Sequence, residues 1–186
     1  MKLVLLDRDG VINEDQPDFV KTPEELVLLP AVGESISRLN EHNIRVALVT
    51  NQSAVGRKII NEMMLDKIHE RMRQLLAKNG AKIDKIIYCG DHPDRPTDRR
   101  KPGGRMLTEA MLHFDSDPNR TIMIGDSLID LQAAARVKCH RMLILTGKGR
   151  KTLDDGIPKE LQPVNVAVTL MQAVDNILSG RIKPKG

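Results

Sequence analysis

The sequence predicts an α/β fold built on a doubly wound parallel sheet. Short, fully apolar runs such as residues 3–6 and 44–49 end abruptly in polar residues, which is typical of buried parallel strands. Segments with helical spacing of their apolar residues alternate with these runs, which indicates repeated strand–helix units. The chain has 186 residues, 40% of them hydrophobic and 29% charged, so it is long enough to bury one core.

Each predicted element rests on a local pattern. The clearest helix spans residues 61–79, where Met64, Ile68 and Met72 recur at helical spacing and Gly80 provides a stop. The predicted strands are residues 3–6, 44–49, 83–89, 121–124, 141–145 and 164–168, and the other predicted helices are residues 32–43, 106–114, 128–137 and 170–178.

The chain is expected to be a single cytoplasmic domain. Residues 1–180 are predicted to form that domain because no repeat or linker divides them, and residues 181–186 are predicted to be a flexible tail. Cys89 and Cys139 lie far apart, so we expect no disulfide framework. The apolar N-terminus meets charge at Asp7, too early for a signal peptide, and no apolar run reaches the roughly 18 residues that cross a membrane.

Composition also limits the possible partners. The net charge of +4 comes from Lys and Arg that are spread along the chain and mixed with acids, which favours a solvated surface over a nucleic-acid footprint. Phe19, Tyr88 and Phe114 are the only aromatic residues, too few for a platform on which bases stack. We expect no nucleic-acid partner and no membrane partner, a small anionic substrate, and a monomer.

Polar side chains follow the predicted strands at the point where each strand ends. Asp7 and Asp9 follow the first strand, residues 50–53 follow the second, and Asp126 follows the fourth. Lys101 lies in the loop after the third strand. Because ligands of open α/β sheets bind beyond the carboxyl ends of the strands, we expect these side chains to converge on one rim.

These residue types indicate phosphoryl transfer assisted by Mg²⁺. Two carboxylates at one strand end, Asp7 and Asp9, are costly unless a hard cation neutralises them, and Asp126 would complete the metal site. One carboxylate can attack phosphorus, and the other can protonate the leaving oxygen and later activate water. Lys101, Thr50 and backbone N–H groups would hold the phosphate oxygens.

Each motif also has a simpler structural interpretation. The pair Asp7 and Asp9 could belong to a turn, Asp126 could cap the helix that follows it, and Thr50 could cap or turn the chain. Lys101 could be a solvated side chain. The joint occurrence of these motifs at successive strand ends favours the functional interpretation.

Four stretches of the chain, in this order, resemble the motifs of haloacid-dehalogenase-like (HAD-like) hydrolases. The resemblance is closer to one branch, which contains the D-glycero-D-manno-heptose 1,7-bisphosphate 7-phosphatases and the related histidinol-phosphate phosphatases. It covers most of residues 1–149 and implies a Rossmann-like sheet without a large cap domain. The stretches are Asp7-Arg8-Asp9-Gly10-Val11, Thr50-Asn51-Gln52-Ser53, Lys101 and Gly125-Asp126-Ser127-Leu128-Ile129-Asp130.

The resemblance implies catalytic and metal-binding roles for the matching carboxylates. Asp7 would be the nucleophile that forms an aspartyl-phosphate, and Asp9 would be the general acid/base. Mg²⁺ would be held by the Asp7 carboxylate, the Asp9 backbone carbonyl and Asp126. Asp130 would lie behind these ligands.

The resemblance also implies a sugar-phosphate substrate and a pocket that holds it. Thr50 and Lys101 would steady the phosphoryl group, and Arg100 would recognise the sugar phosphate. The implied reaction removes the 7-phosphate of D-glycero-D-manno-heptose 1,7-bisphosphate, a step of nucleotide-activated heptose and lipopolysaccharide core biosynthesis. The remaining predicted pocket residues are Asp15, Gln16, Pro17, Asp18, Asn51, Gln52, Ser53 and Arg57.

The sequence departs from this branch in the loop after the third predicted strand. Many members bind a structural zinc ion there through three cysteines and a histidine. This chain has Cys89 and His92, but Thr97, Asp98 and Arg99 stand where a Cys-X-Cys would be. A tetrahedral zinc site needs four ligands, so no zinc is expected.

A second departure concerns the recognition of the substrate. Some relatives carry a lysine directly after the fourth-motif aspartate, where this chain has Ser127, so contact with a remote phosphate would rest on Arg100, Arg57 or Lys148. Two alternatives stay open: a histidinol-phosphate phosphatase or broad phosphomonoesterase of the same branch, and a non-catalytic binder of phosphorylated ligands. An ammonium substrate favours acidic residues over the pocket, and a non-catalytic binder usually lacks a nucleophile or a metal carboxylate.

Overall fold

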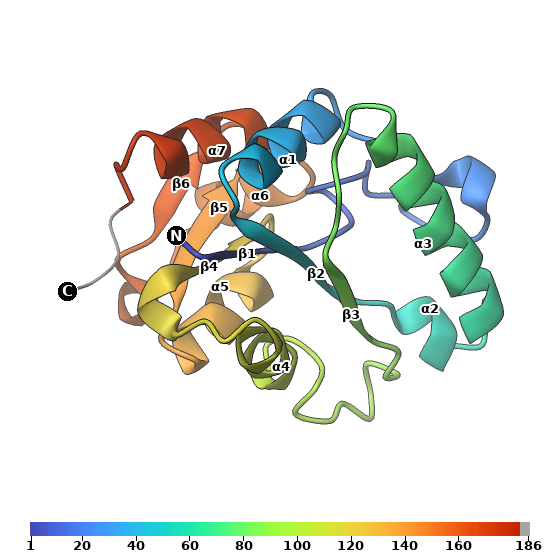
Figure 1. Cartoon of the computed structure of the whole chain (residues 1–186). Helices are drawn as coiled ribbons and strands as arrows, with labels where there is room; N and C mark the ends of the chain where they lie inside the picture. The colour runs from blue at the N-terminus through green and yellow to red at the C-terminus, as the bar shows by residue number, and fades with distance from the viewer. Residues whose placement is uncertain (183–186) are drawn as a thin grey trace.

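Six parallel strands form the central sheet of the computed structural model, which describes residues 1–182 (Figure 1). Their order is β3-β2-β1-β4-β5-β6, so the chain winds outward from β1 in both directions. This arrangement confirms the predicted doubly wound sheet. The strands are β1 (Leu3–Leu6), β2 (Arg45–Asn51), β3 (Lys85–Cys89), β4 (Thr121–Gly125), β5 (His140–Ile144) and β6 (Asn165–Ala167).

Helices cover both faces of the sheet, with α1, α3 and α7 on one face and α4 and α5 on the other (Figure 1). No described helix is long and apolar enough to cross a membrane. The α-helices are α1 (Val32–Glu41), α2 (Ser53–Gly56), α3 (Glu62–Ala77), α4 (Arg105–His113), α5 (Leu128–Arg136), α6 (Gly149–Asp154) and α7 (Leu170–Leu178). Three short 3-10 helices are η1 (Pro23–Glu25), η2 (Pro118–Arg120) and η3 (Lys159–Leu161).

The alternation of side chains along each strand divides the core into two halves. In β1, Val4 and Leu6 pack into the cluster beneath α1, α3 and α7, whereas Leu3 and Leu5 pack into the cluster beneath α4 and α5. Successive residues of a strand point to opposite faces of the sheet. Because helices cover both faces, all four side chains are fully buried. This explains why the strand sequences are apolar throughout.

The second strand is longer than predicted, and this change shapes the site. It continues from the predicted end at residue 49 through Thr50 and Asn51, which pair in register with Tyr88 and Cys89 of β3. These two polar residues therefore lie on a strand and not in a turn. The short helices α2 and α6 were not predicted, because neither is long enough to show a helical period.

The C-terminal end of the described chain is attached to the domain. Within the segment predicted as a tail, Ile182 is buried in the core cluster, and the Arg181 guanidinium donates a hydrogen bond to Asn176 Oδ1 at 3.0 Å. Residues 183–186 lie outside the described residues.

Replacing Leu5 by Ala should strongly destabilise the fold. Leu5 is 0% exposed at the centre of β1, and such truncations cost about 2–5 kcal/mol through lost burial and the cavity left behind. The measurement is urea unfolding followed by circular dichroism. Leu112→Ala is the control, because Leu112 is 77% exposed and its truncation should stay within about 0.5 kcal/mol of wild type. Equal losses in the two variants would contradict the assignment of Leu5 to the core.

Candidate active site

The predicted catalytic residues meet beyond the carboxyl ends of the central strands. Asp7 directly follows β1 and Asp126 directly follows β4, the neighbour of β1 on one side. Thr50 lies at the end of β2, the neighbour on the other side, and Lys101 reaches the same place from the loop before α4. The chain winds away from β1 in opposite directions here, which is where open α/β sheets bind their ligands.

A buried lysine, Lys101, contacts carboxylates from two elements of the site. The Lys101 Nζ lies 3.1 Å from Asp7 Oδ1 and 2.7 Å from Asp130 Oδ1, and it donates a hydrogen bond to the Val49 carbonyl at 2.8 Å. The ammonium thus lies within 3.1 Å of two carboxylates and a backbone carbonyl. Burial lowers the pKa of Lys101, but Asp130 and Asp7 more than offset this and raise it, so the residue stays charged.

The backbone of Lys101 is fixed by Asn51, one of the residues predicted to line the substrate pocket. Lys101 N donates to Asn51 Oδ1 at 3.0 Å, and Asn51 Nδ2 donates to the Lys101 carbonyl at 2.9 Å. The amide of Asn51 is therefore used to place the lysine. This role depends on the extension of β2, because the strand directs the Asn51 side chain at the loop.

Asp130 holds Lys101 from behind. It is 0% exposed, and while Oδ1 faces Lys101, Oδ2 accepts hydrogen bonds from Ser127 Oγ at 2.5 Å and Ser127 N at 3.2 Å. Ser127 and Asp130 form the capping box at the start of α5. The simpler interpretation, in which Asp126 caps this helix, is wrong: Ser127 is the cap and Asp126 is left for the site.

Asp126 rests against two glycine backbones. Its Oδ2 accepts a hydrogen bond from Lys148 N at 2.8 Å. A side chain on Gly10 or Gly147 would place a Cβ 2.1 Å or 2.2 Å from that same oxygen, and both glycines have positive φ values, 79° and 53°. Any other residue at these positions would displace the carboxylate.

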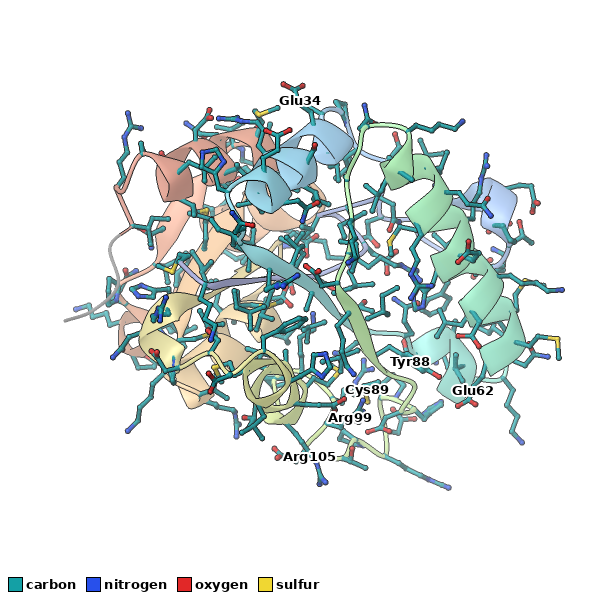
Figure 2. All side chains as sticks on the ribbon, in the orientation of Figure 1. Glu34, Glu62, Tyr88, Cys89, Arg99 and Arg105 are labelled. Atoms are coloured by element: carbon teal, nitrogen blue, oxygen red, sulfur yellow. The ribbon has the colours of Figure 1, made fainter. Side chains whose placement is uncertain are left out.

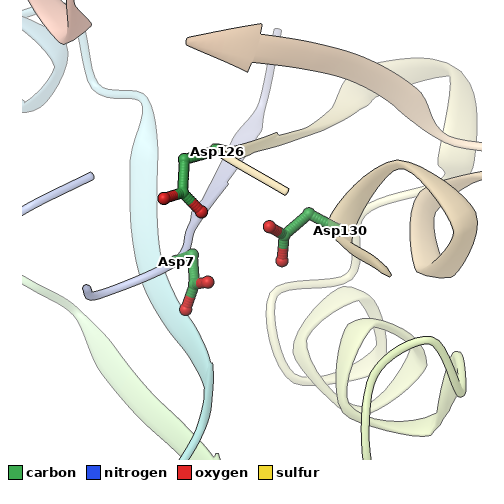
Figure 3. Close-up of side chains that lie close together, drawn as sticks. All are labelled: Asp7, Asp126 and Asp130. Atoms are coloured by element: carbon green, nitrogen blue, oxygen red, sulfur yellow. The ribbon is translucent and has the colours of Figure 1, made fainter. Parts of the chain in front are cut away.

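Three carboxylates, those of Asp7, Asp126 and Asp130, lie close together here (Figure 3), and Lys101 pairs with two of them. One oxygen from each lies within 4.8 Å of the other two. Burial raises the pKa of Asp7 to about 6, with Asp130 and Asp9 adding to the effect, and burial together with the Asp7 charge raises the pKa of Asp126 to about 7.

The donor set fits Mg²⁺, a hard cation that prefers oxygen ligands. Because Asp130 is committed to Lys101 and Ser127, Asp7 and Asp126 are the residues that would hold the ion. The backbone carbonyl of Asp9 stays a predicted third ligand. Bound there, Mg²⁺ would neutralise the excess negative charge and draw electron density from phosphate oxygens.

Asp9 is held by three neighbours, of which only Gln52 was a predicted site residue. Arg8 donates to its Oδ1 through Nε at 3.2 Å and Nη2 at 2.9 Å, and Asn13 Nδ2 donates to the same oxygen at 2.9 Å. Gln52 Nε2 donates to Asp9 Oδ2 at 3.0 Å and to Thr50 Oγ1 at 2.9 Å. Gln52, predicted to bind substrate, thus connects two predicted catalytic residues, Asp9 and Thr50.

These neighbours keep the pKa of Asp9 below its usual range. Burial alone would raise it, but the Arg8 charge and the hydrogen bonds from Asn13, Arg8 and Gln52 lower it. Arg8 is itself buried beneath α3, beside His69, whose pKa burial and the Arg8 charge lower to about 3. In the sequence, Arg8 stands between Asp7 and Asp9, and this placement could have indicated that its guanidinium pairs with one of them.

The other residues predicted for the pocket have contacts of their own. Lys148 Nζ pairs with Asp15 Oδ2 at 3.0 Å, and Arg100 Nη1 donates to the Asp91 carbonyl at 3.4 Å. Asp18 pairs with Lys21 at 2.9 Å on the surface. Half-buried Gln16 and Ser53 and exposed Pro17 and Arg57 complete the set.

Hydrogen bonds hold the loop after β3, for which no zinc was predicted. Asp91 Oδ2 accepts from both Thr97 N and Thr97 Oγ1 at 2.7 Å. Arg99 donates to the Tyr88 carbonyl at 3.2 Å and pairs with Glu109 at 2.5 Å, and Figure 2 shows Tyr88, Cys89 and Arg99 together at this end of β3. Cys89 is buried, and its burial raises the pKa of the thiol.

We predict that the purified protein contains no structural zinc. Hydrogen bonds of Asp91, Thr97 and Arg99 hold the loop at the place where a zinc ion would otherwise join its two ends. Atomic emission spectroscopy after dialysis should find far less than one zinc ion per chain. Zinc in a one-to-one ratio, removed together with folded structure by a strong chelator, would show that the loop is a metal site after all.

Comparison with known proteins agrees with this fold. Residues 98–173 match a family model described as HAD-hydrolase-like. The chain superimposes on the crystal structure of D,D-heptose 1,7-bisphosphate phosphatase from Bordetella bronchiseptica, complexed with magnesium and phosphate, with a TM-score of 0.90. The two are 39% identical, over 96% of this chain and 99% of that one. The protein is a HAD-like hydrolase.

Curated relatives narrow the family further. The chain is 40% identical to the D-glycero-beta-D-manno-heptose-1,7-bisphosphate 7-phosphatase of Pseudomonas aeruginosa, over 84% of this chain and 88% of that protein. It is 35% identical to the protein of the same name from Neisseria meningitidis serogroup B, over 100% and 99%. The chain belongs to the D-glycero-D-manno-heptose 1,7-bisphosphate 7-phosphatase family.

We predict that the crowded carboxylates make the metal-free protein less stable as pH rises. Since the folded-state pKa values of Asp7 and Asp126 are raised to about 6 and about 7, the folded state holds protons more tightly than the unfolded state, and this stabilisation is lost as pH rises from about 4 to about 7. In EDTA, Tm should therefore fall between about pH 5 and about pH 8. Added Mg²⁺ should raise Tm more at the higher pH.

Asp126→Asn tests the cause of this behaviour. Removing one negative charge should raise the Tm of the metal-free protein at about pH 8 and abolish most of its increase with Mg²⁺. Asp115→Asn is the control, since that carboxylate is fully exposed and pairs with Lys2 at the start of β1. If Asp126→Asn keeps the wild-type response to Mg²⁺, Asp126 is not a metal ligand.

Proposed function

We propose that this chain is a Mg²⁺-dependent phosphatase that removes the 7-phosphate of D-glycero-D-manno-heptose 1,7-bisphosphate through an aspartyl-phosphate. The observation that carries the proposal is the buried pairing of Lys101 with Asp7 beside the Asp126 carboxylate. The names of its relatives supply the substrate. The proposed setting is nucleotide-activated heptose and lipopolysaccharide core biosynthesis.

Asp7 is the proposed nucleophile. Its Oδ1 accepts a hydrogen bond from Arg8 N at 2.7 Å and faces Lys101 Nζ, so we assign attack on phosphorus to Oδ2. A bond forms between Oδ2 and phosphorus as the bond from phosphorus to the sugar oxygen breaks. The Lys101 charge favours the ionised form of Asp7 that this step requires.

Asp9 is the proposed general acid/base. It would give a proton to the leaving sugar oxygen, and in the second step it would take a proton from the water that attacks the aspartyl-phosphate. Its lowered pKa suits the second role. For the first role, the negative charge of a phosphate group beside Asp9 would raise the pKa toward the working pH.

Thr50 and Lys101 are the proposed contacts of the transferring phosphoryl group. The Thr50 Oγ1 accepts a hydrogen bond from Gln52, which leaves its own hydrogen to donate to a phosphate oxygen. Lys101 brings a positive charge that is fixed in place before the substrate arrives. Such preorganised donors supply much of the stabilisation in phosphoryl transfer.

The same site argues against the alternatives. Lys148 donates its backbone N–H to Asp126, and Arg100 directly precedes Lys101 in the chain; these cations suit a bisphosphate better than the ammonium group of histidinol phosphate. A non-catalytic binder would not be expected to keep Asp7, Lys101 and Asp126 in one buried cluster. The substrate is a small sugar phosphate, and neither nucleic acid nor membrane is a proposed partner.

The enzyme is further proposed to work as a monomer in the cytoplasm. Cys89 and Cys139 are both buried and are not joined in a disulfide, in line with a reducing compartment. Size-exclusion chromatography with light scattering tests the monomer, for which about 20.8 kDa is the expected mass.

Phosphate release tests the proposed reaction. The wild type should hydrolyse α- or β-heptose 1,7-bisphosphate faster than histidinol phosphate or fructose 1,6-bisphosphate, and EDTA should abolish turnover. Asp7→Asn should lower kcat by roughly 10⁴-fold or more, because an amide cannot form the aspartyl-phosphate. Asp115→Asn should match wild type. Full turnover by Asp7→Asn would rule out the covalent mechanism, and equal slow turnover of all four substrates would rule out the specific substrate.

A further inference from the structure

The two carboxylate oxygens of Asp9 have different surroundings. Oδ1 accepts three hydrogen bonds, two from the Arg8 guanidinium at 3.2 Å and 2.9 Å and one from Asn13 Nδ2 at 2.9 Å. Arg8 and Asn13 are both buried, and these donors occupy the lone pairs of Oδ1. Within the described chain, Oδ2 accepts one hydrogen bond, from Gln52 Nε2 at 3.0 Å. The oxygen that stays able to exchange a proton is therefore Oδ2.

The amide of Gln52 is used completely as a donor. Asp9 Oδ2 is an acceptor, so the amide nitrogen and not the amide oxygen must face it. The same nitrogen donates its second hydrogen to Thr50 Oγ1 at 2.9 Å. One hydrogen thus goes to the proposed acid/base and the other to a proposed contact of the phosphoryl group.

The backbone of Gln52 is fixed on both sides. Its N–H donates to the Cys89 carbonyl at the end of β3 at 2.7 Å, and its own carbonyl accepts from Val55 N in α2 at 3.1 Å. The residue is 4% exposed, and Thr50 is 1% exposed. Since both donor hydrogens are in use and Oε1 is an acceptor, this buried side chain is poorly suited to bind a phosphate oxygen.

We infer that Gln52 is a positioning residue for proton transfer: it holds Asp9 so that Oδ2 exchanges the proton, and it leaves the Thr50 hydrogen for the phosphoryl group. In the first step the proton on Oδ2 passes to the sugar oxygen as the bond from that oxygen to phosphorus breaks. In the second step Oδ2 takes a proton from water as the water oxygen bonds to phosphorus and the bond from phosphorus to Asp7 breaks. This inference rests on the proposed function and assigns Gln52 to the proton transfer of that reaction.

Gln52→Met tests the inference, because it keeps the length of the side chain and removes both donor hydrogens. The value of kcat/KM for heptose 1,7-bisphosphate should fall about tenfold to a hundredfold more than that for p-nitrophenyl phosphate. The sugar oxygen needs a proton as it leaves, whereas nitrophenolate is a weak base and leaves without one. Gln52→Leu, which also removes the donors without adding charge, gives the same comparison if Gln52→Met does not fold.

The matched control is Gln74→Met. Gln74 is an exposed residue of α3 whose amide donates to Glu70 at 3.4 Å, and its loss should leave kcat/KM for both substrates at the wild-type values. An equal fall for both substrates in Gln52→Met, or no fall, would overturn the inference, because Asp9 would then work without Gln52.

A binding measurement separates positioning from contact with the substrate. Turnover is blocked in Asp7→Asn, so the Kd of the bisphosphate can be measured there by calorimetry with Mg²⁺ present. Adding Gln52→Met to this variant should change the Kd by less than about threefold. Binding weakened by about tenfold or more would identify Gln52 as a substrate contact and overturn the inference.

Asp9→Asn separates failure of the inference from failure of the proposed function. Under the proposed function, this variant loses more kcat/KM with the bisphosphate than with p-nitrophenyl phosphate. If Asp9→Asn shows this difference and Gln52→Met does not, the inference is wrong and the proposed function stands. If Asp9→Asn does not show it, or wild type does not hydrolyse the bisphosphate, the proposed function fails and the inference fails with it.

Discussion

The buried ammonium of Lys101 is the interaction on which the site depends. It holds Asp7 at the end of β1 and Asp130 at the start of α5, and it is itself fixed by Asn51 at the end of β2. Two neighbouring strands and a helix are thereby joined through one residue. A buried charge is tolerable only with such partners, so removing one of them would leave the others uncompensated.

The single positive charge of Lys101 does not balance the negative charges of the carboxylates in the site. This excess of negative charge connects stability to function. The raised pKa values of Asp7 and Asp126 express the cost of holding negative charge in a buried cluster. A divalent cation complements the cluster, so the crowding of carboxylates that destabilises the metal-free protein is also what would bind the ion. Gly10 and Gly147 make the arrangement possible by letting two backbones approach the Asp126 carboxylate.

The convergence of Asp7, Lys101 and Asp126 could be predicted from the sequence. The end of each buried strand is visible where its apolar run stops, and the carboxyl ends of parallel strands meet at one edge of the sheet. The sequence did not indicate that Gln52 donates hydrogen bonds to Asp9 and Thr50, or that Lys148 pairs with Asp15. Those contacts depend on loop conformations and on strand length, which hydrophobic periodicity does not encode. The Ser127–Asp130 capping box was readable in principle, since the two residues have the spacing of that motif.

Isothermal titration calorimetry of Mg²⁺ into the metal-free protein, in buffers of different ionisation enthalpy, tests the central claim most directly. At about pH 6.5 the raised pKa values leave protons on the Asp7 and Asp126 carboxylates, and Mg²⁺ must displace them. The account predicts a binding enthalpy that varies with the buffer and corresponds to about one proton released per ion. An enthalpy that is the same in every buffer would contradict the claim that these carboxylates share a crowded, cation-binding site.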